Sequence, residues 1–119
     1  MSDHVSWILT LEINAGREAD LRTLMAEMVA ATQAAEPGAL DYEWHISDDG
    51  KVLHTFERYA DSAATLKHLG NFGAKFAGRF MEIVRPTAFT VYGSPSTEVR
   101  TAMSGFGPVF MERIGGFSR

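Results

Sequence analysis

Three residues of types that take part in proton transfer lie close together in this sequence: Glu57, Tyr59 and His68. Glu57 and Tyr59 share one face of a predicted strand, because side chains alternate along a strand. His68 follows in a predicted helix. A carboxylate and an imidazole that border a pocket between sheet and helices could exchange protons with a ligand. The alternative is a structural interpretation, in which these residues take no part in chemistry. In that case Glu57 pairs with an arginine such as Arg79, and His68 lies at the rim of the fold.

A second group of polar residues lies in the same region. His45 and His54 fall on neighbouring predicted strands and could face each other, with Glu43 nearby. Imidazole and carboxylate groups suit zinc or non-haem iron. No third ligand has a dependable spacing, however, and polar pairs across strands are common. We therefore expect no metal at this position.

Hydrophobic periodicity predicts the elements that position these residues. Alternating apolar residues indicate strands, and apolar residues three and four apart indicate amphipathic helices. The step Asp49-Gly50 between two alternating segments is a strong hairpin signal, and Asp61 is a candidate helix N-cap. We expect the second helix to bend or split at Gly70-Asn71 and to be ended by Pro86. The predicted strands cover 5–13, 40–47, 51–59 and 88–92, and the predicted helices cover 21–32 and 62–84.

This order, β-α-β-β-α-β, is that of an α+β ferredoxin-like domain. We expect the domain to occupy residues 1–93. Residues 94–119 should form a C-terminal extension of the same domain, with a short helix at 97–103 and a short strand at 109–112.

The predicted sheet carries large side chains on both faces. Trp7 and Ile8 are neighbours on the first strand and so point to opposite faces, and Phe56 faces away from Tyr59. Two helices can cover only one face of a four-stranded sheet. The second face therefore needs a partner, and a homodimer that stacks sheet on sheet is the simplest solution.

Charge and composition limit the possible functions. The 119 residues include 11 Lys and Arg against 15 Asp and Glu, with a formal net charge of −4. This balance, with no basic cluster, argues against nucleic acid and against an anionic membrane surface as partners. Cysteine is absent, and the apolar run near the N-terminus is too short and too polar for a signal peptide or a membrane span. We expect a cytoplasmic protein.

Several short motifs resemble the antibiotic biosynthesis monooxygenase (ABM) domain family. They are the run 36–42 (EPGALDY), the run 55–61 (TFERYAD), and Ala64 with Leu66 to Leu69 around His68. The resemblance covers roughly residues 5–93, and the tail 94–119 looks like an extension carried by one branch of the family.

The resemblance implies a dimeric α+β barrel and, for some members, oxidation of phenolic or hydroquinone-type polyketides by molecular oxygen without a metal, flavin or haem. Glu57, Tyr59 and His68 occupy the matching motif positions and are the candidate catalytic residues. From the sequence pattern alone, we add four aromatic residues as candidate walls of a pocket for a small aromatic ligand: Tyr42, Trp44, Phe72 and Phe76.

The sequence also departs from parts of the family. Haem-degrading relatives use an asparagine on the first strand and a tryptophan on a helix, and neither is present here. The tryptophan and asparagine pattern of the polyketide oxygenases is not evident either. Two alternatives to an enzyme therefore stay open. One is a non-catalytic dimer that binds a small aromatic or other apolar molecule, and the other is a structural dimer whose own side chains fill the cavity.

Overall fold

The order of elements follows the predicted β-α-β-β-α-β pattern and continues into the C-terminal extension. The computed structural model describes residues 3–119. In chain order the elements are β1 (Val5–Ile13), α1 (Glu18–Ala35), β2 (Ala39–Ile46), β3 (Val52–Tyr59), α2 (Ser62–Lys75), α3 (Ala77–Ile83), β4 (Val84–Gly93), α4 (Thr97–Met103), the 3₁₀ turn η1 (Ser104–Phe106) and β5 (Val109–Met111).

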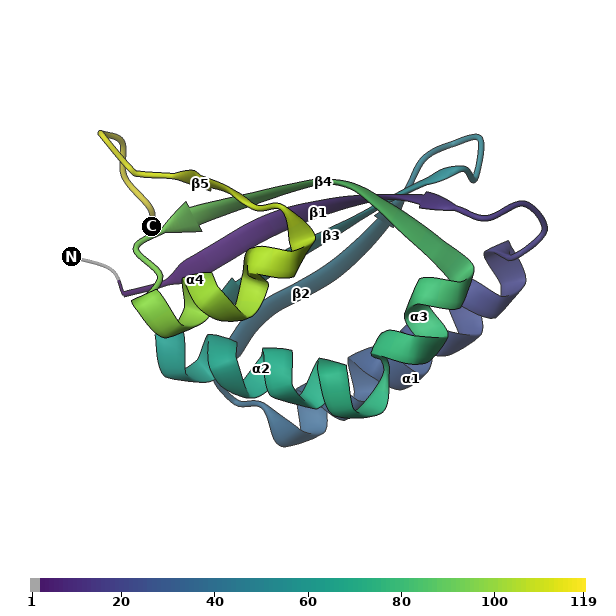
Figure 1. Ribbon diagram of the computed structural model, residues 1–119, viewed down its shortest axis with the longest axis horizontal. Helices are drawn as coiled ribbons and strands as arrows, with labels where there is room; N and C mark the ends of the chain where they lie inside the picture. Colours follow the sequence, from purple (N-terminus) through teal and green to yellow (C-terminus); the bar gives the residue numbers. More distant parts are fainter. Residues whose placement is uncertain (1–2) are drawn as a thin grey trace.

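The strands form one sheet in the order β2-β3-β1-β4-β5. Strand β1 lies at its centre and pairs antiparallel with both β3 and β4, while β5 pairs parallel with β4. Helices α1, α2 and α3 all lie on the same face of this sheet (Figure 1). The ferredoxin-like arrangement predicted from the sequence is confirmed.

Strand β3 shows how the alternation of side chains separates the two faces of the sheet. Thr55, Glu57 and Tyr59 are buried beneath the helices, whereas His54 and Phe56 are exposed on the opposite face. Glu57 is buried although its side chain is polar. The register of β3 places it among residues that face the helices.

The hairpin between β2 and β3 closes at the predicted turn. Gly50 has a φ of 73°, a conformation that a residue without Cβ adopts at no steric cost. The hydroxyl of Ser47 donates to Asp49 Oδ1 over 2.7 Å, and the same oxygen accepts from the backbone N–H of Lys51. The turn sets the register that pairs His45 with His54.

Two expectations about the second helical region were wrong. The helix does not bend at Gly70-Asn71 but continues to Lys75, where one non-helical residue, Phe76, separates α2 from α3. The helical region also ends at Ile83 rather than at Pro86. Pro86 instead belongs to β4, at an irregularity in its pairing with β1. A β-bulge is one of the few places where a strand accepts a residue without an N–H.

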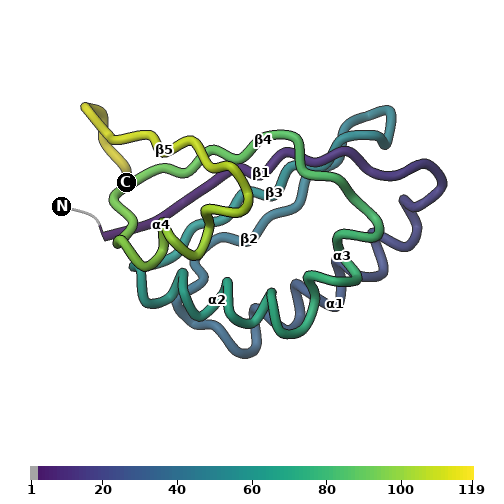
Figure 2. The backbone as a smooth tube through the Cα atoms, viewed as in Figure 1, coloured from purple at the N-terminus to yellow at the C-terminus, as the bar shows by residue number. Residues whose placement is uncertain are grey.

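The C-terminal extension folds back onto its own domain. Ser96 caps α4 by accepting a hydrogen bond from the backbone N–H of Val99. Val99 and Met103 are fully buried in the cluster that also contains Trp7 and Tyr59. The tube in Figure 2 shows the chain then returning along β4 as β5.

Within residues 3–119, no helix combines the length and the apolar character that crossing a bilayer requires.

Candidate functional site

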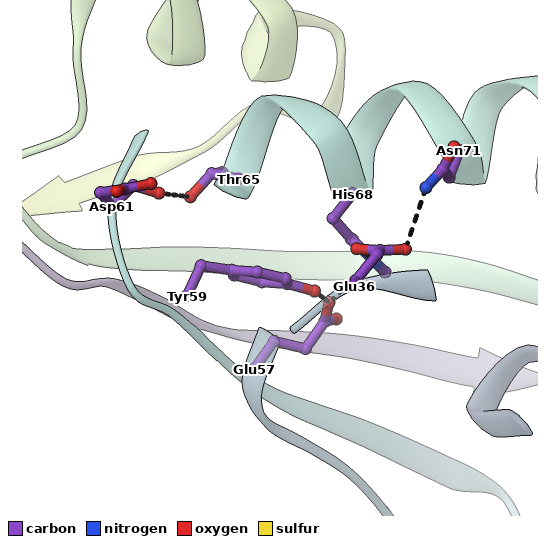
Figure 3. Close-up of polar contacts among 7 residues, drawn as sticks. All are labelled: Glu36, Glu57, Tyr59, Asp61, Thr65, His68 and Asn71. Atoms are coloured by element: carbon purple, nitrogen blue, oxygen red, sulfur yellow. Dashed lines mark hydrogen bonds and ion pairs between the residues drawn. The ribbon is translucent and has the colours of Figure 1, made fainter. Parts of the chain in front are cut away.

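The imidazole of His68 lies between two carboxylates, in the layer between the sheet and the helices (Figure 3). Its Nδ1 is 2.9 Å from Glu36 Oε1, and its Nε2 is 3.3 Å from Glu57 Oε1. All three residues are about 5% exposed. The structural interpretation of the sequence was therefore wrong on two points: His68 is not at the rim, and Arg79 pairs with Glu27 on the surface rather than with Glu57.

Glu57 is held by hydroxyl groups as well as by the imidazole. The Tyr59 hydroxyl donates to Glu57 Oε1 over 2.7 Å, and the Thr55 hydroxyl donates to Glu57 Oε2 over 2.8 Å. Thr55 and Tyr59 flank Glu57 on the same face of β3, so the alternation of the strand itself supplies both donors. The carboxylate is thus buried with its oxygens satisfied, as a buried charge requires.

Two local features bring His68 and Glu36 to the same point. Asp61 caps α2 by accepting from the backbone N–H of Ala64, which starts the helix two turns before His68. Glu36 immediately follows α1, and the chain then passes α2 at Gly38, where an added Cβ would lie 2.6 Å from Ala64 Cβ. The close approach of this loop to α2 needs a residue without a side chain.

The pKa values of His68 and Glu57 are shifted in opposite directions. Burial lowers the pKa of His68, but the carboxylates of Glu57 and Glu36 outweigh it and raise the pKa above its ordinary value. Burial raises the pKa of Glu57, but His68 and the hydroxyls of Tyr59 and Thr55 together hold the pKa below its ordinary value. Both shifts favour an imidazolium beside an ionised carboxylate.

The two tyrosines of the site are held in their neutral form. Burial raises the pKa of Tyr59, and the adjacent charge of Glu57 raises it further. Burial and Glu57 likewise raise the pKa of Tyr42, while Thr32 and Trp44 act in the opposite direction. Neither phenol serves as a base near neutral pH, and the Tyr59 hydroxyl serves as a donor to Glu57.

A cavity of about 50 Å³ lies between the sheet and the helices, and Glu57 and His68 are among the residues that border it. Aromatic side chains form much of its wall, namely Trp7, Tyr42, Trp44, Phe72, Phe80, Phe89 and Phe106. The indole N–H of Trp44 offsets a small part of the rise in the pKa of Tyr42, but the two groups do not reach hydrogen-bond geometry. In the described part of the chain, this indole nitrogen is the one buried side-chain nitrogen or oxygen without a hydrogen-bond partner.

Most of the residues singled out from the sequence border this cavity. Five of them do so: Glu57, His68, Tyr42, Trp44 and Phe72. Tyr59 borders neither this cavity nor its neighbour and contacts Glu57 instead. Phe76 lies in the apolar core and borders a second cavity of about 10 Å³, which His68 also borders.

Sequence reasoning missed Glu36 and its neighbour Asn71, whose side-chain amide donates to Glu36 Oε2 over 3.2 Å. Glu36 belongs to the quoted run 36–42, but no periodicity marks it as buried. The one available signal was a carboxylate at the C-terminal end of a helix, where the helix dipole disfavours negative charge.

The two histidines of the β2–β3 hairpin lie on the face of the sheet opposite to the helices. His45 and His54 are paired residues of β2 and β3, as expected, and His45 Nε2 is 3.0 Å from Glu43 Oε1. These side chains are exposed. Across residues 3–119, no group of three or more His, Asp or Glu side chains is arranged to hold a metal ion.

Comparisons with known proteins agree with this fold. The sequence model of the family "Antibiotic biosynthesis monooxygenase" matches residues 5–85. A search of curated proteins found no match. Among solved structures, MupZ from Pseudomonas fluorescens is 24% identical with a TM-score of 0.89, over 100% of this chain and 91% of that one.

Two further structures are similar over most of their length. Rv0793 from Mycobacterium tuberculosis is 30% identical with a TM-score of 0.61, over 78% of this chain and 96% of that one. SnoaB from Streptomyces nogalater, a cofactor-independent oxygenase, is 17% identical with a TM-score of 0.66, over 81% of this chain and 97% of that one. Since the family model spans more than half of the sequence, the chain belongs to the antibiotic biosynthesis monooxygenase family.

Proposed function

We propose that this protein is a cofactor-independent monooxygenase that oxidises a phenol or hydroquinone with molecular oxygen. Family membership supports a monooxygenase-like role, and SnoaB is an oxygenase of the same fold. The observation that carries the proposal is the aromatic-walled cavity that is also bordered by a buried carboxylate and an imidazole, Glu57 and His68. Such a cavity excludes water around a ring and offers it a proton acceptor and a proton donor.

The reaction needs only the ligand, dioxygen and a group that stores one proton. Glu57 accepts the proton of the phenolic hydroxyl, and the phenolate passes one electron to dioxygen, which gives a phenoxyl radical and superoxide. A C–O bond forms between them at a ring carbon, and the stored proton returns to the resulting peroxide. The ring carbon then loses its hydrogen as a proton, and the O–O bond breaks. One oxygen atom stays as a quinone carbonyl, and the other leaves as water.

The residues of the site have distinct roles in this scheme. Glu57 is the proton acceptor, and His68 stabilises negative charge that develops on the ligand or on reduced oxygen. Tyr59 holds Glu57 in place through its hydrogen bond. The unpartnered indole N–H of Trp44 is available to a ligand oxygen. Tyr42 and Phe72 provide aromatic walls, and Phe76 supports the core behind them.

The cavity must open to admit a substrate. Its volume of about 50 Å³ is smaller than the roughly 150 Å³ that accepts a benzene ring in a protein core. Phe72, Met81 and Phe106 border the cavity and are each partly exposed, so they are the side chains that can move aside. We therefore expect a one-ring substrate, or a larger one that remains partly outside.

Oxygen consumption tests the proposal. Wild-type protein with a hydroquinone, in the presence of a chelator, should consume dioxygen and form a quinone in equal amounts. Replacing Glu57 by Gln should reduce the rate by about 100-fold or more, as expected for a lost acid–base group. His45→Ala is the matched control, because it removes an exposed histidine on the other face of the sheet. Saturable binding of the hydroquinone with no oxygen uptake would instead support a non-catalytic binding protein.

We also propose that the protein is a homodimer, formed by stacking the open faces of two sheets. Large apolar side chains are exposed on that face and along the edge that β5 adds to it: Phe56 is 36% exposed, Tyr92 40%, Met111 49% and Val109 56%. Ile8 and Phe56 are paired residues at the centre of the face. An apolar surface of this kind favours an isologous interface. A cytoplasmic location, with which the lack of cysteine agrees, stays a prediction.

A further inference from the structure

The buried cluster formed by Glu36, Glu57 and His68 contains more negative than positive groups. Two carboxylates, Glu36 and Glu57, face the two nitrogens of one imidazole. The other titratable groups around His68 are the neutral phenols of Tyr42 and Tyr59, whose rings pack against it together with that of Trp7. Lys75 also borders the smaller cavity with Glu36 and His68, but it is an exposed residue. One positive charge thus serves two carboxylates in a place where an unpaired charge is costly.

The two carboxylates differ in what they border. Glu57 borders the aromatic-walled cavity and does not border the smaller one. Glu36 borders only the smaller cavity, whose volume of about 10 Å³ has room for roughly one water molecule. His68 borders both cavities. Any ligand in the larger cavity therefore meets Glu57 but not Glu36.

The position of Glu36 has no local explanation in its helix. It follows the last residue of α1, where unpaired carbonyl groups make negative charge unfavourable. It is nevertheless buried, with one oxygen on His68 Nδ1 and the other accepting from Asn71. Its contacts are thus directed to the imidazole and to the helix that carries it.

We propose that Glu36 is a positioning residue that serves as the permanent counter-ion of His68 and thereby frees Glu57 to accept a proton from the ligand. When Glu57 takes the proton of a phenolic hydroxyl, the O–H bond of the ligand breaks and an O–H bond forms on Glu57. The imidazolium of His68 is then still paired, through Nδ1, with Glu36. Without Glu36, the phenolate formed in the same step would be the one counter-ion of the buried imidazolium.

This division of roles determines which ligands the site favours. A cluster with one excess negative charge disfavours a ligand that arrives as an anion, and it therefore favours a ligand that arrives as a neutral hydroxyl. The reaction in which the proton is used rests on the proposed oxygenase function. The role of Glu36 as counter-ion does not, because it can be measured in the free protein.

The experiment is an NMR titration of ¹⁵N-labelled histidine in wild type, Glu36→Gln and Glu27→Gln. Glu27 lies on α1, the helix that Glu36 follows, and it is exposed and paired with Arg79, so it is the matched control. In wild type at pH 7, both ring nitrogens of His68 should carry a proton. Glu36→Gln should lower the pKa of His68 by about one unit or more, a tenfold loss of proton affinity, because a neighbouring negative charge is removed. Glu27→Gln should leave it unchanged.

A merely structural role of Glu36 makes a different prediction. The glutamine amide oxygen can still accept a hydrogen bond from Nδ1, so a structural contact would survive and the pKa of His68 would not move. An unmoved pKa in folded Glu36→Gln would overturn the proposal. If this variant fails to fold, wild type still decides, since a neutral His68 at pH 7 contradicts the proposal. Glu36→Asp, which retains the charge, should restore at least part of the elevated pKa.

Kinetics separate this inference from the proposed function. If hydroquinones are oxidised, Glu36→Gln should lower kcat/KM about tenfold more for weakly acidic phenols than for nitrophenols already ionised in the assay. An equal loss for both classes would overturn the role in proton transfer. If no phenol is oxidised by wild type but the pKa of His68 falls in Glu36→Gln, the oxygenase proposal fails and the counter-ion role of Glu36 stands.

Discussion

The two faces of the sheet each carry a histidine close to a glutamate, and the two pairs differ chiefly in burial. On the open face, His45 lies 3.0 Å from Glu43, and both side chains are more than half exposed. On the covered face, His68 lies 3.3 Å from Glu57, and both side chains are 7% exposed. The residue types are identical and the distances are similar, so distance does not distinguish a reactive pair from a surface contact.

The difference lies in what surrounds each pair. Water solvates His45 and Glu43 whether or not they interact, so their pairing contributes little free energy. His68 and Glu57 have no such solvent and depend on Glu36, Thr55 and Tyr59 for their remaining hydrogen bonds. A buried pair of this kind couples protonation to stability and to ligand binding.

Replacement of His68 by Ala should have the largest effect on stability. It leaves Glu36 and Glu57 buried without a positive partner, and the loss of one partner of a buried pair costs about 3–5 kcal/mol. Urea denaturation of wild type and variant measures the change in the free energy of unfolding. A change below about 1 kcal/mol would mean that water already reaches this pair as it reaches the one on the open face.

The pH dependence of stability should come from the covered pair. The pKa of His68 is raised above 6.5 in the fold, so its contribution is complete below pH 6.5 and is lost as the pH rises through the folded value. The pKa of Glu57 is lowered below 4.5, so its contribution is complete above pH 4.5 and is lost as the pH falls through the folded value. A tenfold difference in proton affinity between the folded and the unfolded protein corresponds to about 1.4 kcal/mol of stability.

Denaturation between pH 3 and pH 10 tests this expectation. Wild type should lose stability toward both ends of the range, whereas His68→Gln should lose the alkaline decline that His68 causes. His45→Ala should retain both declines, because its histidine is exposed. Parallel curves for wild type and His68→Gln would show that other groups govern the pH dependence.

The contrast between the faces also explains how much the sequence could predict. Period-two alternation correctly placed Glu57 and Tyr59 on one face of β3 and Phe56 on the other. Alternation is a local property, and strands follow it wherever one face is buried. The hairpin was equally predictable, because an Asp-Gly step specifies a turn that few other residues can form.

The rest of the site depends on contacts between distant parts of the chain. Glu36 and His68 are 32 positions apart and meet only because the loop at Gly38 packs closely against α2. Helical periodicity placed His68 in the second predicted helix, and it could not indicate that Glu36, at the end of α1, would contact it. The break likewise falls at Phe76, a buried residue of the core, and not at Gly70, a residue that many helices tolerate at a modest cost.

Replacement of Phe56 by Asp asks whether the open face is an interface. Phe56 is exposed at the centre of that face, so the change should not disturb the core beneath the helices. If two sheets stack there, an unpaired charge should weaken association at least about 30-fold, the effect of a contact worth about 2 kcal/mol. Light scattering coupled to size-exclusion chromatography measures the mass. A monomeric wild type, or a variant that dimerises equally well, would contradict the proposed interface.

The smallest effect is expected from breaking the exposed pair itself. A double-mutant cycle of His45→Ala and Glu43→Gln should give a coupling energy below about 1 kcal/mol, because both side chains remain solvated after either change. The same cycle on His68→Ala and Glu57→Gln should give several times more, since each single change there leaves a buried group without its partner. If the dimer forms through the open face, the coupling of the first pair should rise when protein concentration favours the dimer. A coupling energy at His45 and Glu43 that is as large as at His68 and Glu57 in the monomer would mean that burial does not distinguish the two pairs.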